Sequence, residues 1–97
     1  MTENNFFVVL SIRTPHGFES FGKFNLGNKR KPAVDVFRQL KGNPIVDEKT
    51  ILTIDLVETV KGLPLNLNIL GCTLEDLAYN CRLITKETFK LYNLKQA

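Results

Sequence analysis

The stretch Gly71–Leu94, GCTLEDLAYNCRLITKETFKLYNL, is the longest segment of the chain with a helical spacing of apolar residues. It carries two helix start signals. Thr73 opens a capping box, and Thr85 is a second residue of the type that caps helices. Two start signals predict two helices, roughly over residues 73–82 and 86–94, or one bent helix. The alternative is one continuous helix, because the apolar spacing also continues through the corner.

Alternating apolar residues before this stretch predict four β-strands in two hairpins. The first hairpin turns at Thr14–Gly17, where proline and glycine are typical turn residues, and the second turns at Lys61-Gly62. The predicted strands are Phe6–Thr14, Phe18–Leu26, Thr50–Val60 and Leu63–Leu70. Regular alternation places two rows each on a single face: Phe18, Ser20, Gly22 and Phe24 in the first hairpin, and Leu63, Leu65, Leu67 and Ile69 in the second.

A short helix is predicted between the hairpins, with Asn28 as a candidate N-cap and Pro32 in the first turn. The predicted order is therefore β-β-α-β-β-α(α), a pseudo-repeat of the units 6–42 and 50–94. A hairpin alone is marginally stable, and a helix laid over it supplies a second layer. We expect one α+β domain over residues 1–97, with a four-stranded, mainly antiparallel sheet and the helices packed on one face.

Composition limits the classes of protein to consider. The chain has 97 residues, of which 43% are hydrophobic and 24% charged, as in ordinary globular domains. Its apolar runs are too short to cross a membrane, and its first ten residues lead us to expect no signal peptide. Cys72 and Cys81 are not spaced for zinc. We expect a cytoplasmic protein without a metal, a cofactor or a membrane partner.

Charges of opposite sign alternate along the chain, whose net charge is +3. Basic residues dominate from Arg13 to Lys41, acidic residues from Gly42 to Cys81, and basic residues again from Arg82 onward. The densest basic run directly precedes the predicted first helix, and free amides at a helix N-terminus favour an anion. The run is either a solvated turn or an anion or nucleic-acid site formed by Asn28, Lys29, Arg30 and Lys31.

Within the C-terminal stretch, LEDLAYNCRLITKETF is similar to a helix-turn-helix of bacterial DNA-binding proteins. Ala78 holds the small position under the crossing helix, Thr85 caps the second helix and Phe89 is its first core position. Arg82 stands where the turn of that motif usually has glycine. The resemblance implies an outward stripe that would face a major groove: Lys86, Lys90 and Asn93. The alternative is a pair of helices that only pack on the core.

Signals for catalysis are weak, and we predict no catalytic residues. His16 is the only histidine and falls in a turn, while Asp55 and Glu58 fall on opposite faces of one strand. The sheet face opposite the helices is mixed in polarity, which favours a protein partner or a homodimer. The candidate interface residues are Val9, Arg13, Phe21, Lys23 and Val57. The expected function is a non-catalytic interaction module, and the alternative is a nucleic-acid-binding domain.

Overall fold

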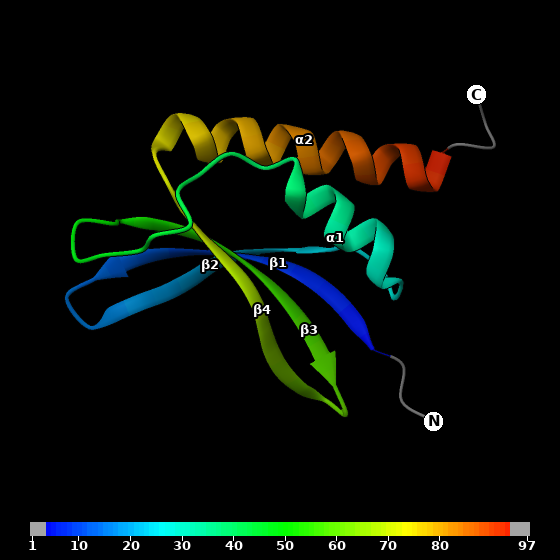
Figure 1. Cartoon of the computed structure of the whole chain (residues 1–97), viewed down its shortest axis with the longest axis horizontal. Coiled ribbons are helices and arrows are strands. Elements are labelled where there is room, and N and C mark those ends of the chain that lie inside the picture. Colours follow the sequence, from blue (N-terminus) through cyan, green and yellow to red (C-terminus); the bar gives the residue numbers. More distant parts are fainter. Residues whose placement is uncertain (1–3, 94–97) are drawn as a thin grey trace.

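A computed structural model describes residues 4–93, with side chains described as far as Lys90. The chain folds into one small α+β domain in which a sheet lies below two helices (Figure 1). Its elements are β1 (Asn5–Thr14), β2 (Gly17–Asn25), α1 (Arg30–Arg38), β3 (Leu52–Val60), β4 (Leu63–Cys72) and α2 (Leu74–Asn93). The predicted α+β class and element order are confirmed. The geometric likeness of the two β-β-α units stays a prediction.

The sheet is antiparallel throughout and has the strand order β2-β1-β3-β4. The two hairpins therefore join through β1 and β3, and both helices cover the same face (Figure 1). Alternate residues of β1 and β3 point into the core on that face, as the sequence pattern predicts. The buried apolar residues are Phe6, Val8, Leu10, Leu26, Ala33, Val36, Phe37, Ile54, Leu56, Cys72, Leu77 and Ile84.

Each edge strand of the sheet, β2 and β4, contains a β-bulge, and the bulges place some side chains on a different face from the predicted one. In β2, Leu10 pairs with Gly22 but Ser11 pairs with Ser20, so Phe21 is an extra residue. One inserted residue moves every side chain beyond it to the opposite face. Phe18 consequently lies on the face away from the helices, and not beside Phe24 as predicted.

The bulge in β4 has the same effect. Leu56 pairs with Asn68 and Val57 with Asn66, so Leu67 is the extra residue. Ile69 therefore lies on the face away from the helices, whereas Leu65, on the other side of the bulge, lies on the helix-bearing face. The prediction that these leucines and Ile69 share one face is wrong, because a local insertion leaves the sequence alternation intact while inverting the side chains.

The helix α2 runs without interruption through the predicted corner, so the prediction of two helices is wrong and the alternative of one continuous helix is confirmed. The first start signal is confirmed, because the Asp76 amide donates to the Thr73 hydroxyl (3.1 Å) and the Thr73 amide donates to the Asp76 carboxylate (3.2 Å). Thr85 does not start a helix. Leu77 before it and Ile84 beside it are both buried, and a continuous helix keeps both on the core.

Asn80 joins α2 to the segment that follows α1. Its side chain is fully buried. The side-chain amide donates to the Lys41 carbonyl (2.7 Å), and its oxygen accepts from the Lys41 amide (2.7 Å). The Asn80 amide also lies 3.6 Å from the Cys72 sulfur. This one side chain therefore links α2 to the segment that follows α1 and to the last residue of β4.

The helix α1 begins at Arg30, slightly later than predicted, and Pro32 lies in its first turn as expected. Lys29 is in the N-cap position and makes no side-chain capping hydrogen bond, so Asn28 is not the N-cap. Arg38 is the last helical residue, and the chain then crosses to β3 through a long loop. In that loop Asn43 pairs with Gly71 at the edge of β4. The loop thereby covers one end of this edge strand.

Candidate interaction face

The sheet face away from the helices is the candidate site, and we call it the outer face. Both helices pack on the opposite side of the sheet, so neither covers it (Figure 1). The strand pairings align its residues in three rows, each taken from β2 to β4. The rows are Asn25, Phe7, Val57 and Asn66; then Lys23, Val9, Asp55 and Ile69; then Ser20, Ser11, Thr53 and Gly71.

A shallow hollow lies at one end of the outer face. It has a volume of about 330 Å³ and is lined by Phe7, Val9, Lys23, Val57, Thr59 and Pro64. The Lys23 ammonium lies 4.4 Å from the centre of the Phe7 ring, a cation–π contact. Three of the five predicted interface residues therefore meet in one place: Val9, Lys23 and Val57.

Phe7 was missed as an interface residue, although the sequence contained the signal. It alternates with Val9 along the same strand, so the two must share a face. Two adjacent phenylalanines, Phe6 and Phe7, open that strand, and only the first belongs to the core.

The other two predicted interface residues, Arg13 and Phe21, do not line this hollow. Arg13 donates to the carbonyls of Thr50 (2.8 Å) and Asp47 (2.9 Å), and its guanidinium stacks over the Phe18 ring at 4.5 Å. It therefore fixes the long loop against the sheet. Phe21 sits in the bulge of the edge strand β2 and is 54% exposed. Phe21 is thus an exposed aromatic side chain at the edge of the sheet.

Asp55 is the acidic residue in the middle of the outer face, between Val9 and Ile69. The Asn66 amide donates to one carboxylate oxygen at 2.7 Å. The other oxygen, Oδ1, is shielded from solvent and makes no hydrogen bond of acceptable geometry. Burial raises the pKa of Asp55 more than its polar neighbours lower it. The folded chain thus holds a carboxylate where its charge is unfavourable.

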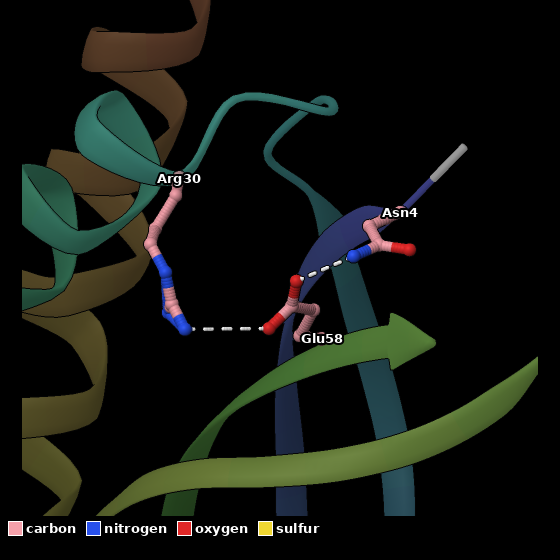
Figure 2. Close-up of polar contacts among 3 residues, drawn as sticks. All are labelled: Asn4, Arg30 and Glu58. Atoms are coloured by element: carbon pink, nitrogen blue, oxygen red, sulfur yellow. Dashed lines mark hydrogen bonds and ion pairs between the residues drawn. The ribbon is translucent and has the colours of Figure 1, made fainter. Parts of the chain in front are cut away.

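The basic run forms the start of α1, with Lys29 at the N-cap and Arg30 and Lys31 as the first helical residues, and it is partly engaged within the molecule. Arg30 lies 3.5 Å from the buried carboxylate of Glu58, which also accepts from the Asn4 amide at 2.8 Å (Figure 2). Lys31 forms a 2.9 Å ion pair with Asp35 one turn along α1. Two of the predicted anion-binding cations therefore already have acidic partners.

The turn of the helix-turn-helix resemblance is absent. Arg82 lies inside the continuous helix α2 and does not have a positive φ. Phe89, which the resemblance places in a core, is 66% exposed. Lys90 pairs with Glu87 at 3.3 Å, and Lys86 is exposed on the same helix. The side chain of Asn93 lies outside the described residues.

Groups that could carry chemistry are dispersed. Burial raises the pKa of the Cys72 thiol to about 11, which disfavours the reactive thiolate. The backbone amide of His16 bonds to the Thr14 hydroxyl in the hairpin turn. Across residues 4–90, no three His, Cys, Asp or Glu side chains gather to hold a metal ion. None of the described helices is long and apolar enough to span a membrane.

Comparison with protein-family models finds no matching family, and comparisons with curated proteins and with solved structures find no significant match. The geometry of the outer face is therefore the basis for a functional proposal.

Proposed function

We propose that this protein is a non-catalytic interaction module that associates with a second copy of itself through the outer face. The observation that carries this proposal is the uncovered apolar surface around Phe7, Val9 and Val57. These side chains are half-buried, and sheet-to-sheet packing would remove the rest of their surface from water. The two free thiols fit a reducing compartment, so the proposal places this association in the cytoplasm.

The polarity of the outer face supports a second copy as the occupant. A two-fold interface uses the same patch on both partners, so the patch must complement itself. The outer face carries a cation, Lys23, and an anion, Asp55, on either side of apolar Val9. A surface with both signs beside an apolar centre meets this requirement.

Sedimentation equilibrium of the wild-type chain and of two matched variants tests the proposal. The wild-type mass should rise with concentration from 11.0 kDa toward twice that value. Val57→Asp places a charge in the apolar centre and should weaken association by roughly 30-fold or more, the effect of about 2 kcal/mol at a central interface position. A wild-type chain that stays monomeric at millimolar concentration would contradict the proposal.

Leu63→Asp is the matched control for Val57→Asp. Leu63 is 71% exposed at the tip of the β3–β4 hairpin, opposite Val60 and so on the helix-bearing side of the sheet. The same charge is introduced there on an exposed apolar residue, outside the proposed interface. Its dimerisation should match that of the wild type. Equal weakening by both variants would mean that the outer face is not the interface.

Nucleic-acid binding is a second candidate function, favoured by one observation. The beginning of α1 and the later turns of α2 lie at the same end of the long axis of the molecule (Figure 1). Lys29–Lys31 belong to the first of these segments, and Lys86 and Lys90 belong to the second. Binding through them predicts affinity for mixed oligonucleotides that falls steeply with salt. Absence of binding at low salt would exclude this function.

A further inference from the structure

The outer face has a charge pattern that specifies how two copies would be arranged. We propose that the two copies are related by a two-fold axis running along β1, so that Lys23 of each copy pairs with Asp55 of the other. This inference rests on the proposed self-association and adds the register and the partner contacts of the interface.

The strand pairings supply the geometry. Val9 of β1 pairs with Lys23 of β2 on one side and with Asp55 of β3 on the other. The two charged residues are therefore each one strand from β1, and roughly 10 Å apart in total. A two-fold axis in the plane between the sheets and along β1 exchanges the two sides of that strand. Lys23 of one copy then lies over Asp55 of the second copy, and the reverse pair forms at the same time.

The normal twist between packed sheets does not disrupt this pairing. Aligned sheets cross at about 30°. Because each charge is only about 5 Å from the axis, this rotation displaces it by about 2.5 Å. The lysine side chain is long and flexible enough to accommodate such a shift. Val9 lies at the axis and packs against Val9 of the second copy.

The second observation behind this arrangement is that the carboxylate of Asp55 is partly buried in the single chain without a cation beside it in the described residues. Within the described part of the chain, Asp55 forms no ion pair. Burial raises its pKa, so the ionised form is unfavourable in the isolated copy. An ammonium from a partner would stabilise this charge. Lys23 is already on the same surface, because its ammonium lies over the Phe7 ring.

Two single charge reversals, Lys23→Glu and Asp55→Lys, test the arrangement when they are mixed. Each variant alone would bring like charges together at both pairs of a homodimer, and should dimerise at least ~10-fold more weakly than the wild type. In the mixed heterodimer, the two introduced side chains would face each other with opposite charges, and the native Asp55 of one chain would face the native Lys23 of the other. The mixture should therefore associate at least ~10-fold more tightly than either variant alone. If a substitution weakened dimerisation by damaging the fold of its own chain, mixing the two variants would not restore dimerisation.

The readout is sedimentation of the two variants and of their mixture, with circular dichroism to verify folding. A mixture as weak as its components, beside a wild type that dimerises, would overturn the arrangement and leave the proposed self-association standing. A monomeric wild type would overturn both.

Zero-length carbodiimide crosslinking of wild-type chains provides a test that does not depend on variant folding. A mixture of isotopically light and heavy chains should yield mixed-isotope crosslinked peptides that join Lys23 to Asp55. A crosslinked dimer in which these residues are never joined would contradict the proposed pairing.

Discussion

Replacing Asn80 with alanine should destabilise the fold far more than replacing an exposed asparagine. The substitution removes two 2.7 Å hydrogen bonds to the backbone of Lys41. A net hydrogen bond contributes about 1 kcal/mol, and a polar group left without its partner costs about 1–3 kcal/mol. Both hydrogen bonds are only partly buried, so the lower part of that range applies to each lost bond. The expected loss is about 2–4 kcal/mol.

That loss is large for a chain of this length, whose total stability is expected to be about 5–15 kcal/mol. Urea unfolding followed by circular dichroism measures it, and the thermal midpoint should fall by roughly 10–30 °C. Asn68→Ala is the matched control, because Asn68 is exposed and, within the described part of the chain, its side chain accepts only from the next residue's amide. An Asn80→Ala variant within about 0.5 kcal/mol of the control would refute the role assigned to this side chain.

Three further predictions concern single groups. Asp55→Asn, measured where the chain is monomeric, should raise the thermal midpoint at pH 7, because burial disfavours the charge that it removes. The gain should disappear well below pH 3.8, where the carboxyl is protonated in both the folded and the unfolded chain; a gain that persists there would contradict this cause. Thr73→Ala should cost about 1 kcal/mol in urea unfolding, whereas Thr73→Ser should retain the cap; equal stabilities would contradict it. Iodoacetamide should modify Cys72, with a pKa of about 11, much more slowly than the less buried Cys81; equal rates in mass spectrometry would refute this.

The strands and the α+β class could be predicted because their signals are local. Alternation along each strand and the turn chemistry at Gly17 and Lys61-Gly62 do not depend on the rest of the chain. At the second turn, Lys61 and Gly62 both have positive φ, as a tight hairpin turn requires. Local physics therefore suffices for these elements.

The bulges and the single helix could not be predicted, because they depend on contacts with distant parts of the chain and local signals do not record such contacts. A bulge at Phe21 or Leu67 depends on which residue the neighbouring strand pairs with, and the alternation of β2 and β4 does not record it. A cap at Thr85 is locally favourable, but burying Ile84 on a continuous helix outweighs it. Tertiary packing determines both outcomes.

The candidate site was predictable in part. Val9, Lys23 and Val57 were assigned to one surface from alternation alone, and the structure places them around one hollow. The hydrogen bonds from Arg13 to the long loop depend on how the folded chain places that loop beside β1, which the sequence does not show. The same holds for Asn80, whose polar side chain interrupts the apolar helical spacing and takes its partner from a distant segment.

The most direct test of the outer face as a self-association surface is a concentration series of methyl and backbone NMR spectra. Resonances of Val9, Val57 and Phe7 should shift progressively as the chain is concentrated from micromolar to millimolar. Resonances of Leu63 and Phe89, which lie away from the outer face, should stay fixed. Two results would contradict self-association through the outer face. One is concentration-dependent shifts confined to α2 or to the hairpin tip, and the other is the absence of such shifts from residues of the outer face.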